Sequence, residues 1–453
     1  MVSLGCDKNL CDSETMLGIL AEKGYNITND ESEADCVIVN TCGFIKDAMQ
    51  ESIDTLLEMA QLKEGRLKYL IACGCLAERF KGEITDEIPE IDAVVGTTAF
   101  DKIAEVIERL DNPEAEIDES VSLDKNGRPA VICDLDRLVA PETGRVITSS
   151  PYMAYLKIAE GCNKRCTYCI IPKLRGNYRS VPMERLIAEA KSLAGQGIKE
   201  LILVAQETSS YGVDIYGEKR LHTLIQALAA IDGIEWIRLM YCYPEEIYDG
   251  LIDCFRHEKK LLHYIDMPIQ HSEDAILKRM GRKTDKESIK KVIGKLREAA
   301  PDIAIRTTLI AGFPGETDED HEALMGFIDE MEFDRLGVFT YSAEDGTPAA
   351  VMTDQVPSEK AEQYLKDIME LQQEISMDKN ETLTGQTLPC IIEGYEPDEN
   401  VYVARSYRDA PGVDGLVFVK SDRELMSGAV VDVHITDAAE YDLVGDFIGY
   451  TEL

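Results

Sequence analysis

The chain has no long apolar run and few basic residues for its size. None of its apolar segments approaches the roughly 20 residues that a membrane-spanning helix needs, and its N-terminus is too short and too polar to be a signal peptide. Basic residues number 47 against 85 acidic ones, a net charge of −38. We therefore expect a cytoplasmic protein with no membrane partner. Because so acidic a surface repels phosphate, a nucleic-acid partner would need a local basic patch.

Internal repeats and low-complexity tracts are also missing from the sequence. Its 453 residues are 45% hydrophobic and 29% charged, which is typical of a globular protein with two to four domains of roughly 100–200 residues each. The 13 cysteines are numerous for such a chain. In a reducing compartment, cysteines in close clusters more often bind metal or perform redox chemistry than form disulfides.

Short apolar runs alternate with helical patterns in residues 1–125. Strands are predicted at Cys36–Asn40, Tyr69–Cys73 and Ala93–Gly96, with helical periodicity between them. This rhythm predicts an open parallel α/β sheet. Met1–Leu4 resembles the end of a first strand, and it begins so abruptly that we expect residues before it to be missing.

Residues 126–147 are irregular, with Pro and Gly among charged residues, and we interpret them as a linker. Residues 148–380 then show six strand patterns with helical patterns between them. These strands are predicted at Ala154–Ile158, Glu200–Ala205, Trp236–Tyr241, Leu262–Met267, Ala304–Ile310 and Leu336–Tyr341. Six consecutive βα units favour a partial or complete (β/α) barrel, whose functional residues would lie at the carboxyl ends of the strands.

The pattern changes again in residues 381–453, to short alternating strands separated by turn residues. The predicted strands are Leu388–Glu393, Val401–Ser406, Gly415–Val419 and Val430–Ile435. Such a series predicts a small β-barrel or sandwich.

Three cysteines with C-x3-C-x2-C spacing follow the first strand of the predicted barrel: Cys162, Cys166 and Cys169. Three thiolates on one loop can bind three irons of a cubane cluster and leave the fourth iron open. Zinc is the main alternative, but a structural zinc site needs a fourth Cys or His close by, and this loop has none. Buried cysteines without a ligand fit poorly, because the flanking residues are polar and turn-like. The spacing therefore favours a 4Fe–4S site.

With an aromatic residue, Tyr168, before the last cysteine, this motif resembles that of the radical S-adenosylmethionine (SAM) superfamily. The resemblance implies that the open iron chelates the amino and carboxylate groups of SAM, and that Tyr168 lies near the adenine. Taken alone, Tyr168 would be an ordinary packing aromatic.

Three further cysteines, Cys6, Cys42 and Cys75, are far apart in sequence, yet each lies just past a predicted strand and beside a glycine. Ligand sites of open α/β sheets gather at that edge, and glycine allows close approach of the backbone. Singly, each would more often be a buried small hydrophobic residue. The local competitors are Cys11, at the beginning of a helix, and Cys36 and Cys73, inside predicted strands.

The segments SLGCDKN, NTCGFI and GCL around these cysteines resemble the methylthiotransferases of the radical SAM superfamily. The resemblance covers essentially the whole chain, because the C-terminal segment resembles the TRAM domain of that family. It implies that Cys6, Cys42 and Cys75 hold a second 4Fe–4S cluster, and that an electron from a flavodoxin- or ferredoxin-type donor starts the cleavage of SAM to a radical. A radical is needed because the reaction replaces an unactivated C–H bond by C–SCH3.

Several stretches resemble the branch of this family that modifies an aspartate β-carbon of small-subunit ribosomal protein S-12. They are Ile158–Glu184, Ala205–Asp214, Tyr341–Ala349 and Asp409–Gly415. The branch that modifies isopentenyladenosine in tRNA usually has a basic residue where this chain has Glu344, and Pro where it has Asp345. The tRNA-modifying activity remains the alternative within the family.

The charge of the C-terminal segment bears on this choice. From Gly385 to Leu453 there are four basic and fourteen acidic residues, a net charge of about −10. That balance argues against gripping RNA and favours a basic ribosomal protein as partner. Two other interpretations stay open: an acidic surface that only confers solubility, and a non-catalytic iron–sulfur or zinc scaffold.

Weaker signals concern the other strand ends of the predicted barrel. Gln206 and Glu207 could hydrogen-bond the amino group of SAM. Arg306 and Gly312 belong to RTTLIAGFPGET, where glycine could let the backbone approach the adenosyl group; the motif lacks the Lys of a P-loop, which argues against nucleotide hydrolysis. His271 could be catalytic, although structural histidines are commoner. No catalytic side chain is expected beyond the cluster ligands.

Overall fold

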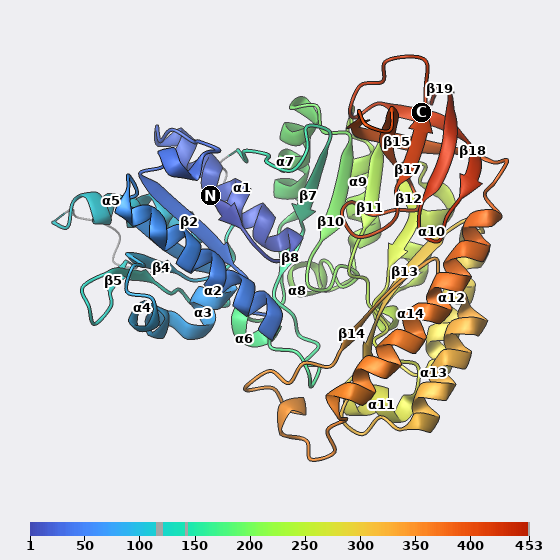
Figure 1. Ribbon diagram of the computed structural model, residues 1–453, viewed down its shortest axis with the longest axis horizontal. Coiled ribbons are helices and arrows are strands. Elements are labelled where there is room, and N and C mark those ends of the chain that lie inside the picture. The colour runs from blue at the N-terminus through green and yellow to red at the C-terminus, as the bar shows by residue number, and fades with distance from the viewer. Residues whose placement is uncertain (115–120, 141–143, 452–453) are drawn as a thin grey trace.

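Three main sheets, each formed by one region of the chain, organise the computed structural model of the protein (Figure 1). The structure describes residues 1–114, 121–140 and 144–451. An N-terminal α/β domain lies beside a central α/β unit, and a C-terminal barrel caps one end of the central unit. Among the described helices, none combines the length and the apolar character of a membrane-spanning segment.

The N-terminal sheet has six strands in the order β1-β2-β3-β4-β6-β5. Their bounds are Val2–Ser3 for β1, Cys36–Thr41 for β2, Tyr69–Gly74 for β3, Ala93–Val95 for β4, Ser122–Leu123 for β5 and Pro129–Val131 for β6. Neighbouring strands are parallel except β5 and β6. The expected open parallel sheet is therefore confirmed, and β2 and β3 are almost continuously apolar because helices cover both of their faces.

Five α-helices lie in the described part of this domain. They are α1 (Asp7–Glu22), α2 (Lys46–Gln61), α3 (Cys75–Phe80), α4 (Ile84–Glu87) and α5 (Ile103–Asp111).

The segment interpreted as a linker, residues 126–147, contributes a strand to the N-terminal sheet. Strand β6 pairs in parallel with β4, and Val131 is fully buried in the core of that domain. The strand is only three residues long and follows the tight turn at Gly127. Short strands beside turn residues give little periodicity, which is why the sequence pattern concealed it.

Six parallel strands form the central sheet in the order β14-β13-β12-β11-β10-β7. They are β7 (Met153–Lys157), β10 (Glu200–Val204), β11 (Trp236–Leu239), β12 (Leu261–Asp266), β13 (Ala304–Ala311) and β14 (Arg335–Thr340). Because β7 and β14 are the two edges, the sheet is a partial barrel, as the six βα units indicated. A two-stranded pair, β8 (Ala159–Glu160) and β9 (Arg179–Ser180), extends from β7.

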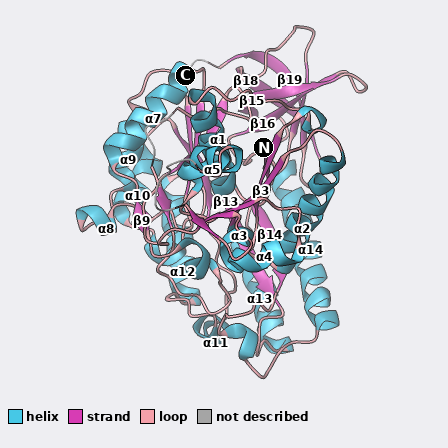
Figure 2. Ribbon diagram, turned by 90° about the vertical axis from the view of Figure 1, so that its left-hand side faces the viewer, coloured by secondary structure: helices cyan, strands magenta, loops and turns pink. Residues whose placement is uncertain are grey.

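Helices cover the outer face of this partial barrel and bury a large Leu- and Ile-rich core against it (Figure 2). They are α7 (Met183–Gly195), α8 (Val213–Tyr216), α9 (Leu221–Ala229), α10 (Asp249–His257), α11 (Asp274–Arg279), α12 (Lys286–Ala299), α13 (Asp318–Met331) and α14 (Ser358–Glu381). The short helix α6 (Ile171–Arg175) lies instead against the N-terminal domain, where Leu174 packs on Cys75.

The C-terminal region is a closed five-stranded barrel, β15-β16-β17-β19-β18. Its strands are β15 (Thr387–Glu396), β16 (Val401–Ser406), β17 (Val417–Lys420), β18 (Val430–Ala438) and β19 (Leu443–Tyr450). Arg405 of this barrel binds Glu200, the first residue of β10, with Nη2 2.6 Å from Oε2. The barrel thus packs on the amino ends of the central strands, opposite the end where function is expected.

Candidate functional site

The central cysteine triplet lies in a loop beyond β7 and β8, at the carboxyl end of the partial barrel. Left-handed residues at Gly161 (φ +78°) and Arg165 (φ +57°) fold the loop. A side chain at Gly161 would meet the carbonyl oxygen of Asn177 at 2.1 Å, so glycine is required there. Burial raises the pKa of Cys162 to about 11 and that of Cys169 to about 12. Thiolates here would therefore need a cation such as iron to stabilise them.

Several buried polar atoms near this loop have no hydrogen-bond partner among the residues that the structure describes. They are the hydroxyls of Tyr168, Tyr178, Tyr341 and Ser209, Oε1 of Gln206, Oε2 of Glu207, and Nε and Nη1 of Arg282. Buried polar groups in folded proteins are nearly always paired, so an unpaired set suggests a bound polar ligand. SAM carries an ammonium, a carboxylate and a nucleoside, which suit such a mixture of donors and acceptors.

Gln206 and Glu207 both present a free acceptor. Nε2 of Gln206 donates to Oε1 of Glu160 at 2.7 Å, which leaves the amide oxygen free. Oε1 of Glu207 accepts from the backbone N–H of Ser209 at 2.8 Å, which leaves Oε2 free. These oxygens suit an ammonium group, and the expected contact with SAM remains a prediction.

The aromatic residue of the motif, Tyr168, lies in an aromatic group at the same end. Its ring meets Phe313 edge-on at 6.3 Å between centroids, and Phe313 meets Tyr341 at 5.4 Å. Arg282 stacks on Tyr243, 4.2 Å from the ring centroid, and binds Glu245 at 3.1 Å. The role of Tyr168 at the adenine also remains a prediction.

Arg306 and Gly312 are engaged by the protein itself. Nη1 of Arg306 donates to Asp266 at 2.9 Å, and its Nε donates to Asp414 of the C-terminal region at 3.2 Å. Gly312 has φ +75°, and a Cβ there would lie 2.3 Å from that of Ala361 on α14. The structure therefore shows Gly312 packed closely against a helix, and its expected approach to the adenosyl group stays a prediction.

His271 is fully buried and both of its nitrogens have partners. Nδ1 accepts from the backbone N–H of Glu273 at 3.0 Å, so Nε2 carries the proton and faces Glu316 at 3.4 Å. The same carboxylate accepts the backbone N–H of Gly312 at 2.6 Å. These contacts connect His271, in the loop after β12, to Glu316 in the turn after β13. They favour a structural role for His271, and a catalytic role stays a prediction.

The N-terminal cysteines gather at the carboxyl edge of their own sheet. Cys42 follows β2 and Cys75 begins α3 directly after β3; the two strands end at the same level, with Thr41 opposite Gly74. A Cβ at Gly43 would lie 2.8 Å from the carbonyl carbon of Cys75. Glycine therefore brings these two loops into contact.

Cys6 is exposed and immediately precedes α1. A Cβ on the preceding Gly5 would lie 2.8 Å from that of Cys42. Burial raises the pKa of the Cys75 thiol to about 11, while Arg175 acts in the opposite direction and the neighbouring Cys6 and Cys42 raise it further. The structure thus brings the three predicted residues together.

The competing cysteines lie in the protein interior. Cys73 packs in the core of the N-terminal domain, with Cys36 partly buried against the same core. Cys11 is buried between α1 and β7, where its Sγ lies 3.5 Å from the carbonyl oxygen of Tyr155.

The two cysteine groups adjoin each other across the domain interface. Cys75 forms a small buried cluster with Ile170 and Leu174, and Ile170 directly follows Cys169. Within the described parts of the chain, no group of three or more His, Cys, Asp or Glu side chains is placed to hold one metal ion. In a cubane each cysteine binds a different iron, so its ligands need not converge on one point.

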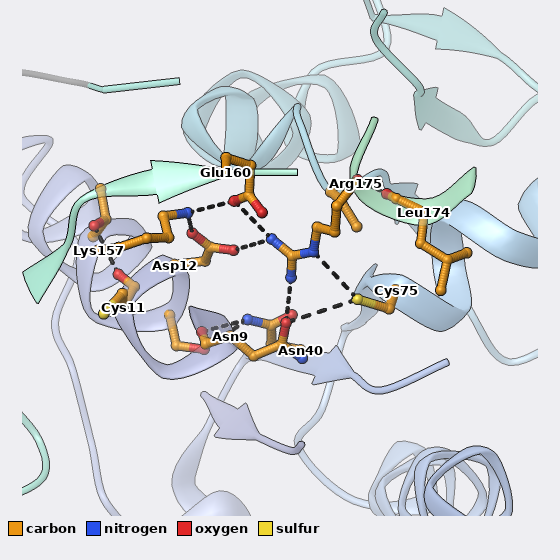
Figure 3. Close-up of polar contacts among 12 residues, drawn as sticks. Asn9, Cys11, Asp12, Asn40, Cys75, Lys157, Glu160, Leu174 and Arg175 are labelled. Atoms are coloured by element: carbon orange, nitrogen blue, oxygen red, sulfur yellow. Dashed lines mark hydrogen bonds and ion pairs between the residues drawn. The ribbon is translucent and has the colours of Figure 1, made fainter. Parts of the chain in front are cut away.

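Three cationic side chains of this region escaped the sequence analysis: Arg79, Arg175 and Arg282. Arg79 donates to the carbonyl of Gly43 at 2.9 Å and to Glu344 at 3.0 Å. Arg175 lies at the centre of a buried polar network between the domains (Figure 3). Their partners lie up to 265 residues away in sequence, so local patterns could not reveal them. For Arg175, the local signal was a charged residue between Leu174 and Gly176.

Three acidic residues in the stretches that resemble the ribosomal-protein branch, Glu344, Asp409 and Asp414, are buried. Glu344 accepts hydrogen bonds from Arg79 and from the backbone N–H of Lys46. Asp409 binds Arg335 at 2.6 Å, and Asp414 binds Arg306. Each pairs with an arginine because an unpaired buried carboxylate is costly. They hold domains together and form no docking surface.

Comparison with known proteins gives three matching family models along the chain. Residues 1–96 match the uncharacterized protein family UPF0004, residues 156–328 the radical SAM superfamily, and residues 384–448 the TRAM domain.

Among solved structures, the radical SAM methyltransferase TsrM from Kitasatospora setae has a TM-score of 0.54 at 14% identity, covering 84% of this chain and 75% of that one. The cobalamin-dependent radical enzyme OxsB has a TM-score of 0.52 at 11% identity, covering 80% and 53%. Both show likeness of fold alone.

Curated relatives are much closer in sequence. The ribosomal protein uS12 methylthiotransferase RimO of Lachnoclostridium phytofermentans is 55% identical over 445 residues, covering 98% of each chain. RimO of Thermoanaerobacter sp. is 48% identical and covers 99% of each chain. The chain belongs to the RimO family. As a RimO-family member it is a radical SAM methylthiotransferase that uses SAM and two 4Fe–4S clusters.

Proposed function

We propose that this protein adds a methylthio group to the β-carbon of an aspartate in small-subunit ribosomal protein uS12. The observation that carries the proposal is the 55% identity to a RimO protein over 98% of both chains. Because this similarity covers the N-terminal domain, the partial barrel and the TRAM barrel, it favours the same substrate and the same reaction.

Cys162, Cys166 and Cys169 would hold one cluster, and Cys6, Cys42 and Cys75 the other. When bound, the clusters and SAM supply the radical and sulfur chemistry that an unactivated C–H bond requires. The contact of Cys75 with Ile170 supports the idea that both groups serve one reaction chamber. Helix α1 contributes to its wall, since Asp7 accepts a hydrogen bond from the Tyr241 hydroxyl at 2.9 Å at the carboxyl end of β11.

The residues around the triplet would orient SAM. The free oxygens of Gln206 and Glu207 would accept from its ammonium group, and Tyr168 with Phe313 would bound the adenine. Burial raises the pKa of the Glu207 carboxyl, so a cationic ligand would stabilise its ionised form.

Exposed acidic residues of the TRAM barrel would attract the basic substrate protein. Asp398 and Glu399 lie in the turn between β15 and β16, and Asp422 and Glu424 follow β17; all four are exposed. Opposite charges of this kind mainly increase the rate at which enzyme and substrate protein meet.

A flavodoxin- or ferredoxin-type protein would supply the electrons. The cytoplasm, where ribosomes are found, would be the location.

The test is to incubate the anaerobically reconstituted protein with SAM, a reductant, and either uS12 or isopentenyladenosine-containing tRNA. Mass spectrometry should show one added methylthio group on one aspartate of uS12 and none on the tRNA. Modification of the tRNA with unchanged uS12 would refute the proposal and favour the tRNA-modifying alternative. Two cubanes per chain are expected; fewer would favour a scaffold role.

A further inference from the structure

Arg175 is a fully buried arginine at the interface between the N-terminal domain and the partial barrel. It is the last residue of α6, and its side chain is 2% exposed. Nη1 donates to Asp12 at 2.8 Å and to Glu160 at 3.1 Å, and Nη2 donates to the amide oxygen of Asn9. The remaining nitrogen, Nε, lies 3.4 Å from the sulfur of Cys75 (Figure 3).

The charges around Arg175 balance before the sulfur is counted. Lys157 also binds Asp12 and Glu160, so two cations face two carboxylates, all of them buried or nearly so. A thiolate at Cys75 would add a negative charge, and the Nε–H of Arg175 is the donor directed at it. A guanidinium suits this position because its planar fork serves several acceptors at fixed angles.

The same side chain connects the two cysteine groups. Glu160, which accepts from Arg175, lies two residues before Cys162, and its other oxygen accepts from Gln206 at 2.7 Å. One continuous set of hydrogen bonds thus runs from the sulfur of Cys75 to the residues beside the central triplet.

We infer that Arg175 is a positioning residue for the N-terminal cluster: its Nε–H hydrogen-bonds the Cys75 sulfur, fixes that ligand relative to the central triplet and raises the cluster's reduction potential. Hydrogen bonds to ligand sulfurs and nearby positive charge favour the reduced form of an iron–sulfur cluster. The inference rests on the proposed function, in which Cys75 is a cluster ligand.

The test uses the full chain with Cys162, Cys166 and Cys169 replaced by Ala, so that only the N-terminal cluster remains. Iron analysis and a redox titration followed by electron paramagnetic resonance (EPR) give its occupancy and midpoint potential. Arg175→Lys keeps the charge, but its single nitrogen should stay with Asp12 and Glu160 and release the sulfur. We expect the midpoint potential of the cluster to fall by at least about 59 mV, which makes its one-electron reduction at least tenfold less favourable.

Arg145→Lys is the matched control. Arg145 is also a buried arginine between these domains, and its Nη2 lies 3.6 Å from the sulfur of Cys11, which is outside the proposed ligand set. Its replacement should leave the potential unchanged. An unchanged potential in Arg175→Lys would refute the inference, as would equal shifts in both variants, because those would reflect a loosened interface.

Two further measurements separate the possible failures. If the triple-alanine parent binds no cluster, the ligand assignment of the proposed function fails and the inference falls with it. If Arg175→Lys does not fold, the parent itself decides: with arginine labelled by ¹⁵N in the guanidinium group, pulsed EPR should detect a ¹⁵N coupling to the cluster. Absence of that coupling in a cluster-loaded parent would refute the inference alone.

Discussion

The partial barrel meets its two neighbouring domains through buried ion pairs, but the arginines at the two interfaces bind different kinds of partner. Towards the TRAM barrel, Arg405 binds Glu200 and Arg335 binds Asp409, each at 2.6 Å, so arginines meet carboxylates. Towards the N-terminal domain, Arg79 also binds the carbonyl of Gly43, and Arg175 also reaches the sulfur of Cys75. The first interface holds domains together, whereas the second also positions the loops that carry the predicted cluster ligands.

The largest effect should come from separating the two cysteine groups. Replacing Cys162, Cys166 and Cys169 by Ala should abolish SAM cleavage, because no other side chain in that loop can bind iron as a thiolate does. Replacing Cys6, Cys42 and Cys75 should preserve SAM cleavage and abolish methylthio transfer. Chromatography of 5′-deoxyadenosine and mass spectrometry of uS12 measure the two activities.

The control for both variants is Cys73→Ala, which alters a cysteine of the N-terminal core outside either group. It should retain both activities in the folded fraction. Wild-type production of 5′-deoxyadenosine by the first variant would contradict the assignment of the central triplet.

Breaking one ion pair at each interface should distinguish their roles. Arg405→Met leaves the buried Glu200 with Arg238 alone, and removal of one partner of such a pair costs about 3–5 kcal/mol. The melting temperature should fall, with SAM cleavage per folded molecule unchanged.

Glu344→Gln, at the other interface, should instead raise the ratio of 5′-deoxyadenosine to methylthiolated product. The reason is that Glu344 would no longer form its ion pair with Arg79, which holds the loops after β2 and β3.

The exposed pair of Arg66 and Asp35, at 3.0 Å in the N-terminal domain, provides the control for stability. Arg66→Met should leave the melting temperature nearly unchanged, because water screens such a pair. If Glu344→Gln left the product ratio unchanged, the interface with the N-terminal domain would be only structural.

These interfaces also mark the limit of prediction from sequence. The α/β order, the partial barrel and a small C-terminal β-barrel followed from strand rhythm, and the central triplet followed from local spacing. The TRAM assignment and the choice of Cys6, Cys42 and Cys75 rested on the position of these cysteines after strands together with the resemblance to the methylthiotransferases. The burial of Asp409, Asp414 and Glu344 did not, because a charged residue is expected at the surface until its distant partner is known. Arg175 escaped for the same reason, and β6 was too short to show a period.

A smaller effect is expected from reversing exposed charges on the TRAM barrel. Changing Asp398, Glu399, Asp422 and Glu424 to Lys should slow uS12 modification severalfold at low salt and leave substrate-free SAM cleavage unchanged. The difference should fade as salt shortens the Debye length to about 10 Å at 0.1 M. A rate that is equal to that of the unaltered protein at every salt concentration would show that these acidic residues serve solubility only.

The smallest effect concerns the pH dependence of a partly exposed pair within the partial barrel, His263 and Asp302. A hydrogen bond to Asp302 at 2.6 Å raises the pKa of His263 above 6.5, although partial burial opposes the shift. The folded state therefore holds this proton more tightly, so the stabilisation is complete below pH 6.5 and is lost as pH rises through the raised pKa. Since both groups are partly exposed, we expect less than about 1 kcal/mol. Urea unfolding of His263→Gln should lack this pH dependence.

The TRAM barrel is not an interchangeable part of this protein. Arg408 reaches Asp334 at 2.7 Å, next to the pair of Arg335 with Asp409. A chimera that replaces residues after α14 by the TRAM barrel of another enzyme would leave Glu200, Asp334 and Arg335 without these partners, unless the donor supplies equivalents of Arg405, Arg408 and Asp409. Grafting this domain to exchange substrate range therefore requires a donor barrel with matching residues, or transfer of the amino ends of the central strands together with the barrel.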